Sequence, residues 1–160
     1  MAGLISRLLD PSRIILTLQS SKRTTALNEL AHTLKAHEDM LNFDGFYQEL
    51  LARDRLDTTC LGNGVAVPHA RTEHVRNIIM AVGRSPQGIV FDNGHETVNL
   101  MFMLGTPKTK PGDYLQVVSA LCRLLKDPAN KQALMKAATP EAFMEALVAA
   151  ENSVGVPVKC

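Results

Sequence analysis

A histidine that follows a glycine-rich turn is the feature of this sequence best suited to chemistry. Residues 62–69 read Gly-Asn-Gly-Val-Ala-Val-Pro-His. Gly62 and Gly64 lack a Cβ atom, so the backbone there can approach a bulky anion and present its N–H groups to it. Pro68 restricts the direction in which the chain leaves the short Val-Ala-Val strand, and with it the direction of His69. A neutral imidazole held at a strand end can act as a nucleophile.

The same spacing also fits a purely structural role, in which a glycine turn precedes a histidine that caps a loop. The other candidate motifs are weaker. The sequence has no P-loop and no dinucleotide-binding fingerprint, so no nucleotide or other cofactor is expected. His69, Glu73 and His74 superficially resemble metal ligands, but their spacing does not place both rings on one helical face, and no metal is expected. His32 and His37 are expected to be solvated residues on or just beyond a helix.

Composition narrows the class of protein. The chain has 160 residues, the usual length of one domain, and a net charge of +1. Near-balanced charge and only 4% aromatic residues argue against nucleic-acid binding. The longest apolar runs, Ile78–Val82 and Leu100–Leu104, are too short to cross a bilayer, so no membrane insertion is expected. The three cysteines have neither disulfide nor zinc spacing, which fits a reducing cytoplasm; they are Cys60, Cys122 and Cys160.

Helical and strand patterns alternate along the chain, which predicts an α/β fold around one sheet flanked by helices. Strands are expected at residues 13–19, 65–67, 77–83 and 97–104, with loops at 85–94 and 106–112. Amphipathic helices are expected around residues 27–34, 46–53 and 115–125, the last capped by Asp113. Two short helices should begin at Pro128 and Pro140, each after a capping Asp or Thr. We expect a single domain at residues 1–151 and a flexible tail at residues 152–160.

The glycine–histidine segment, read with its surroundings, resembles a known signature. Arg53-Asp54, Thr58-Thr59 and Leu61–Arg71 together are similar to the active-site region of the fructose/mannitol-type enzyme IIA domain of the bacterial phosphoenolpyruvate-dependent phosphotransferase system. The free-standing nitrogen-regulatory branch of that family is the best match in size. The similarity extends from about Leu4 to Leu147 and implies the enzyme IIA fructose/mannitol-type fold, with a single mixed β-sheet.

The resemblance implies a phosphoryl relay. His69 would accept a phosphoryl group from a histidine-containing phosphocarrier protein, then pass it to an enzyme IIB domain or signal to a regulatory target. Phosphoryl transfer asks mainly for positioning and charge stabilisation, and an arginine fork suits phosphate oxygens. The residues expected to bind phosphate are Arg53, Thr59, Gly62, Asn63, Gly64 and Tyr114. Arg71 is as consistent with an exposed surface charge as with a phosphate ligand. The Thr59 hydroxyl could instead form a hydrogen bond within the turn.

Two departures from the family pattern affect this expectation. Tyr114-Leu115 stands where the family usually has a His-Leu pair, and a phenol cannot carry the positive charge of an imidazolium. Asp54 stands where glutamate is typical. The alternative is therefore a non-catalytic regulatory interaction module that keeps the fold with weakened phosphotransfer. A third, weaker alternative is a small-molecule sensor that binds its ligand in the pocket predicted for phosphate.

Overall fold

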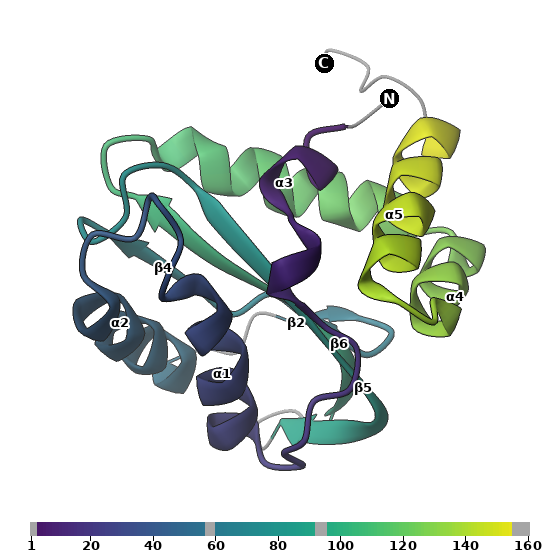
Figure 1. Cartoon of the computed structure of the whole chain (residues 1–160), viewed down its shortest axis with the longest axis horizontal. Coiled ribbons are helices and arrows are strands. Elements are labelled where there is room, and N and C mark those ends of the chain that lie inside the picture. The colour runs from purple at the N-terminus through teal and green to yellow at the C-terminus, as the bar shows by residue number, and fades with distance from the viewer. Residues whose placement is uncertain (1–2, 57–59, 92–95, 155–160) are drawn as a thin grey trace.

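The protein is built around one mixed β-sheet that carries helices on both faces (Figure 1). The computed structural model describes residues 3–56, 60–91 and 96–154. The strand order is β1-β5-β6-β3-β2, and β4 also pairs with β6. The strands are β1 (Ile14–Ile15), β2 (Cys60–Gly62), β3 (Val65–Ala66), β4 (His69–Thr72), β5 (Ile79–Phe91) and β6 (Glu96–Pro107). The predicted α/β fold with a single mixed sheet is confirmed.

The long antiparallel pair of β5 and β6 forms the centre of the sheet. Its side chains alternate between two apolar clusters, as the pleat of a strand requires. Met80 and Val82 belong to one cluster, whereas Ile79 and Ala81 belong to the other. Because both faces are covered, these strands appear in the sequence as nearly continuous apolar runs.

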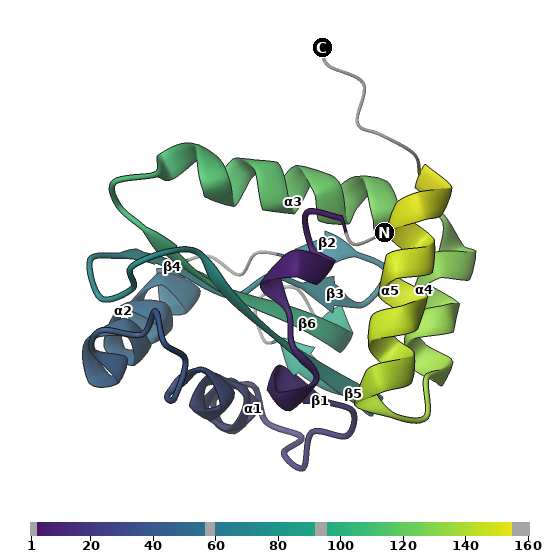
Figure 2. The same ribbon diagram turned by 45° about the horizontal axis from the view of Figure 1, so that its top comes forward.

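Two groups of helices cover the two faces of the sheet (Figure 2). One face carries α3, α4 and α5 together with the short 3-10 helices η1 and η2, and the other carries α1, η3 and α2. Their bounds are η1 (Ser6–Leu8), η2 (Pro11–Arg13), α1 (Arg23–Ala31), η3 (His32–Leu34), α2 (Phe43–Leu56), α3 (Pro111–Leu125), α4 (Pro128–Lys136) and α5 (Pro140–Val154). The candidate site lies where the end of α2 and the start of α3 meet the sheet.

Three predicted boundaries inside the sheet are wrong, and one is the start of the loop expected at 106–112, because β6 continues to Pro107. The strand expected at residues 13–19 is only Ile14–Ile15, because the Leu16 carbonyl accepts a hydrogen bond from the buried Arg84 guanidinium (2.9 Å). The loop expected at 85–94 instead belongs to β5 as far as Phe91. An irregularity in register between Arg84 and Ile89, with Gly88 at φ +88°, lets the strand continue and bury its apolar end. Residues 92–94 lie outside the described part of the chain.

The helix ends agree more closely with the sequence. Asp127 accepts a hydrogen bond from the Ala129 N–H at the start of α4 (2.9 Å), and Thr139 accepts one from the Ala142 N–H at the start of α5 (3.0 Å). The cap predicted for α3 is wrong, because the helix already begins at Pro111 and Asp113 lies within its first turn. α5 continues to Val154, so residues 152–154 of the predicted tail are helical. Residues 155–160 are not among those described.

Candidate functional site

His69 is the first residue of β4, and a proline places it there. β3 and β4 both run parallel to β6, with Val65 beside Leu100 and His69 beside Leu104. Pro68 separates β3 from β4, but its carbonyl still accepts a hydrogen bond from the Leu104 N–H of β6 (2.9 Å). The histidine is thus fixed by ladder contacts on the edge of β6, and only 5% of its surface is exposed.

The hydrogen bond of the ring defines which nitrogen can react. His69 Nδ1 lies 2.9 Å from the Val67 carbonyl oxygen. A carbonyl oxygen can only accept, so Nδ1 carries the proton and donates it. In the neutral ring, Nε2 therefore holds the free lone pair.

The surroundings favour that neutral ring. Burial lowers the pKa of His69 below the ordinary histidine value, and the positive charges of Arg53 and Arg71 lower it further. The hydrogen bond to Val67 and the carboxylate of Asp54 act in the opposite direction without reversing the shift. An imidazole with a lowered pKa at neutral pH is available as a nucleophile.

Tyr114, in the first turn of α3, lies against the histidine. The two ring centroids are 4.3 Å apart and the ring planes differ by 28°, a stacked arrangement. The helix that carries Tyr114 covers the sheet face beside β6, so the stack fixes the second side of the imidazole. The resemblance implied that Tyr114 takes part in the site, and the structure places it against His69.

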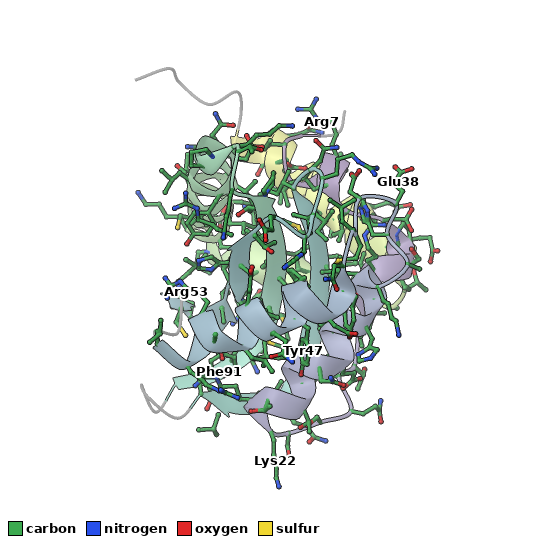
Figure 3. All side chains as sticks on the ribbon, turned by 90° about the vertical axis from the view of Figure 1, so that its left-hand side faces the viewer. Arg7, Lys22, Glu38, Tyr47, Arg53 and Phe91 are labelled. Carbon is green, nitrogen blue, oxygen red and sulfur yellow. The ribbon has the colours of Figure 1, made fainter. Side chains whose placement is uncertain are left out.

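Arg53 and Asp54 lie near the end of α2, and Asp54 is anchored by a partner that the sequence analysis missed. Arg23, in the first turn of α1, donates from Nε to Asp54 Oδ2 (2.6 Å) and also donates to the Asp54 backbone carbonyl. The same guanidinium lies over the Phe91 ring, 5.2 Å from its centroid. Figure 3 shows Arg53 at the end of α2 with Phe91 below it in the view. No periodic signal links residues 23 and 54, because the contact depends on how α1 and α2 pack.

The glycine turn is not brought to His69. Gly62, Asn63 and Gly64 have φ of +87°, +55° and +78°, and they form the turn between β2 and β3. The Gly64 carbonyl accepts hydrogen bonds from the Asn99 and Leu100 N–H groups of β6, whereas His69 lies beside Leu104. A register difference of about five residues corresponds to roughly 16 Å along the strand. The turn instead contacts Lys131 of α4, whose ammonium donates to the Asn63 carbonyl. The predicted phosphate contacts of these three residues therefore have no support in the geometry; their role is to form a left-handed hairpin turn.

Substitution of the two glycines should show this structural role. Gly62→Ala should lower the free energy of unfolding by about 1–2 kcal/mol, the cost of a left-handed conformation for an L-residue. Gly64→Ala should cost more, because its Cβ would also lie 2.7 Å from Asn99 Oδ1 and 3.3 Å from the Thr97 carbonyl. Urea unfolding measures both values. Full stability of Gly64→Ala would contradict this structural role.

Thr59 lies outside the described residues. Within the described ranges, no group of three or more His, Cys, Asp and Glu side chains is arranged to hold a metal ion. Among the helices that the structure describes, none has the length and apolar character needed to span a membrane.

The fold and site define a class: an α/β domain in which one oriented, neutral imidazole begins a short strand paired with β6 and stacks against an aromatic ring. Comparison with known proteins gives the family. Residues 7–150 match the family described as phosphoenolpyruvate-dependent sugar phosphotransferase system, EIIA 2. The chain belongs to this family, which confirms the resemblance carried by the Arg53–Arg71 region. EIIA domains are phosphotransferase components.

Individual relatives agree with the family. A nitrogen regulatory protein of Bradyrhizobium diazoefficiens is 33% identical over 125 residues, which cover 77% of this chain and 80% of the relative. The fructose-specific EIIABC component of Bacillus subtilis is 25% identical over 142 residues, 88% of this chain. The chain spans 22% of that protein's length and 21% of the length of the Escherichia coli 2-O-α-mannosyl-D-glycerate-specific EIIABC component.

Solved structures share the same fold. The nitrogen regulatory protein IIA-Ntr of Neisseria meningitidis superposes with a TM-score of 0.81 at 29% identity, covering 91% of this chain and 99% of the other. The mannitol enzyme IIA of Escherichia coli, solved in complex with its phosphorylated enzyme IIB, gives a TM-score of 0.77 at 19% identity. That match covers 88% of this chain and 97% of the other.

Proposed function

We propose that this protein is a phosphoryl carrier that accepts a phosphoryl group on His69 Nε2 from a histidine-containing phosphocarrier protein. The Nε2 lone pair attacks phosphorus in line, the nitrogen–phosphorus bond of the donor breaks, and its electron pair returns to the donor imidazole. The observation that carries the proposal is the Nδ1–H bond to Val67, which leaves Nε2 as the reactive atom. The role implies a cytoplasmic location.

Positive charge near the ring suits the group that would be transferred. Burial is the main cause of the lowered His69 pKa, and the charges of Arg53 and Arg71 contribute to it. The same positive charges would stabilise the phosphoryl oxygens. Arg53 is proposed as the fork that binds them. The hydroxyl groups of Tyr114 and Thr59 are proposed as additional, neutral donors.

A docking partner would find apolar surface on both sides of this charge. Leu56, one turn beyond Arg53 on α2, is 83% exposed, and Leu115, next to Tyr114, is 66% exposed. Each leucine would be removed from water when a partner covers it, which favours binding. We propose that the phosphocarrier donor binds here, and that an enzyme IIB domain or a regulatory target binds the same surface afterwards. The complex of the mannitol relative with enzyme IIB supports an enzyme IIB domain as a partner.

The alternative remains a regulatory module with weakened phosphotransfer. Two observations favour it: Tyr114 occupies the position of the family's second histidine, and the His69 ring is nearly buried. Under this alternative, the same docking surface would bind partners without covalent chemistry.

A labelling experiment tests the proposal directly. The protein is incubated with the phosphoenolpyruvate-dependent kinase, the phosphocarrier protein and labelled phosphoenolpyruvate, beside the variants His69→Ala and His74→Ala. Acid-labile label on the wild type and His74→Ala, absent from His69→Ala, is the expected result. If no form takes up label while partner binding persists, the interaction module is the correct function. Equal labelling of His69→Ala would place the phosphoryl group elsewhere.

The titration of His69 provides a second check. Because burial, Arg53 and Arg71 lower its pKa from 6.5, the ring should lose its proton at a pH below 6.5. Only the deprotonated ring can attack, so phosphorylation should be independent of pH above that midpoint and should fall below it. NMR titration of the ring measures the midpoint, which should rise in Arg71→Gln. A wild-type midpoint at or above 6.5 would contradict the electrostatic argument.

A further inference from the structure

A hollow separate from His69 lies at the edge of the sheet beside β1 and the start of β5. It has a volume of about 620 Å³ and is lined by residues 7–10 and 13, residues 36–39, and Asn77 with Ile78. This volume is within the range of small-molecule sites. Two strands, β5 and β6, lie between the hollow and the strand that carries His69.

One wall of the hollow holds a histidine with a defined tautomer. The Asp39 backbone N–H donates to His37 Nδ1 (2.9 Å), so Nδ1 is the acceptor and Nε2 carries the proton. Burial and the charge of Arg13 lower the pKa of His37, and the carboxylates of Asp39 and Glu38 oppose that shift. At neutral pH the ring is therefore uncharged and offers one N–H donor.

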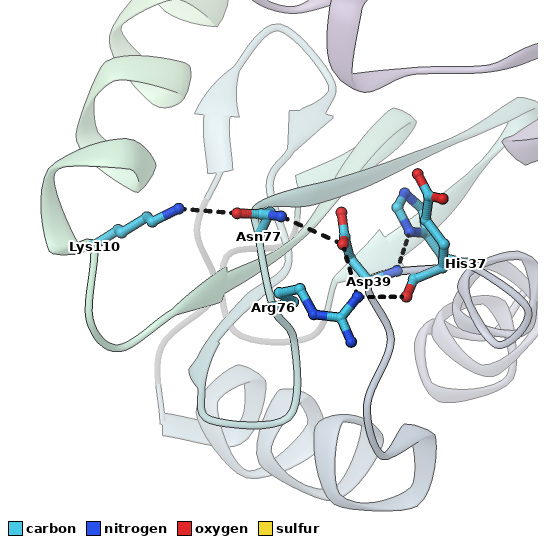
Figure 4. A network of polar contacts seen from close by, with 6 residues as sticks. His37, Asp39, Arg76, Asn77 and Lys110 are labelled. Atoms are coloured by element: carbon cyan, nitrogen blue, oxygen red, sulfur yellow. Dashed lines mark hydrogen bonds and ion pairs between the residues drawn. The ribbon is translucent and has the colours of Figure 1, made fainter.

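A network of polar contacts holds this wall in place (Figure 4). Asn77 Nδ2 donates to Asp39 Oδ1 (3.3 Å), and Lys110 donates to Asn77 Oδ1 (2.9 Å). Arg76 lies 3.7 Å from Asp39 Oδ1 and donates to the Glu38 carbonyl. These contacts join the chain after η3, the residues before β5 and the start of α3. The polar groups are thus fixed before any ligand arrives, which reduces the ordering cost of binding.

The lining carries both signs of charge over an apolar base. Arg7 and Arg13 are cationic, and the carboxylates of Asp10, Glu38 and Asp39 are anionic. Arg13 donates to two backbone carbonyls, of Met80 (3.2 Å) and Leu8 (3.2 Å), so its position is fixed while part of its guanidinium stays available. A purely anionic ligand would meet three carboxylates and a purely cationic ligand two guanidinium groups. A ligand with both charges satisfies both.

We propose that this hollow binds a small zwitterion of the α-amino-acid class. Its carboxylate would lie against Arg7, Arg13 and the His37 N–H, and its ammonium group against Asp39 and Glu38. The aliphatic side chains of Leu8, Leu9 and Ile78 form the apolar part of the site. The proposal is independent of phosphotransfer at His69.

The test uses the whole chain, labelled with ¹⁵N, and a panel of the common L-amino acids, each at about 10 mM, a concentration that detects millimolar dissociation constants. At least one amino acid should shift the amide signals of Asp39, Arg76 and Asn77. Its two single-charge analogues, the amine without the carboxylate and the acid without the amine, should bind at least about tenfold more weakly, because each leaves part of the lining unpaired.

Variants locate the site. Arg7→Gln and His37→Gln should each weaken binding about five- to tenfold, whereas His32→Gln, a histidine substitution outside the hollow, should not. Thermal unfolding of each variant shows that it is folded. The proposal is overturned if no amino acid shifts these signals, if the single-charge analogues bind equally well, or if His32→Gln weakens binding as much as His37→Gln.

Discussion

Arg23→Met is expected to lower the free energy of unfolding by about 3–5 kcal/mol, the usual cost of leaving a buried charge without its partner. The Arg23 and Asp54 side chains are only 12% and 6% exposed, and their closest atoms are 2.5 Å apart. Methionine keeps most of the aliphatic contact but removes both donors to Asp54. Chemical denaturation at neutral pH measures the loss.

The variant should also show a characteristic pH dependence. Burial raises the pKa of Asp54 above 3.8, and the hydrogen bond and charge of Arg23 hold that rise in check. Without Arg23 the folded-state pKa rises further, so the folded protein binds a proton that the unfolded chain does not. The stability deficit should therefore be smaller at about pH 5 than at about pH 7.5.

A double substitution separates the ion pair from simple packing. Arg23→Met with Asp54→Leu removes both charges and should recover much of the loss, because two apolar groups leave no unpaired charge. If Arg23→Met were as stable as the wild type, or if the second substitution added a full further loss, the pair would not be the stabilising contact between α1 and α2.

The elements that build the core could be predicted because their patterns are local. The apolar runs in β5 and β6 and the spacing of Leu121 and Leu125 in α3 follow from burial on known faces. What the sequence did not reveal is how long each strand is. β5 continues past Pro86 and buries Ile89 and Phe91 in the same apolar cluster as residues of α1, and that burial depends on tertiary packing.

Only part of the site could be predicted, because only some of its residues are neighbours in the sequence. Pro68 and His69 are adjacent in the sequence, so their relationship is local, and the resemblance placed Arg53 and Tyr114 near them. The glycine turn is equally close in sequence, but an extended strand carries it away from the histidine at about 3.3 Å per residue. The Val67 carbonyl and the Arg23 guanidinium could not be predicted, since one is a backbone atom and the other lies 31 residues from its partner.

Arg53→Gln is expected to slow phosphorylation of His69 about 10²- to 10³-fold, the usual effect of removing one preorganised donor to a developing anion. Glutamine keeps the length and polarity of the chain end but loses the charge and the two-pronged fork. Arg53 is only partly exposed near the end of α2, and its charge already acts on the His69 ring. The rate should be measured at saturating phosphocarrier, so that the loss appears in the transfer step rather than in docking.

The neighbouring arginine supplies a matched control. Arg55 lies two residues further along α2 and is exposed, and the shift of the His69 pKa has no contribution from it. Arg55→Gln should leave the transfer rate within about threefold of the wild type, and both variants should unfold within about 0.5 kcal/mol of it. Equal slowing by both substitutions would mean that the carrier recognises the overall charge of this helix end. A large loss of stability in Arg53→Gln alone would make Arg53 a structural residue, and the phosphoryl group would then need another cation, with Arg71 the nearest candidate on the strand of His69 itself.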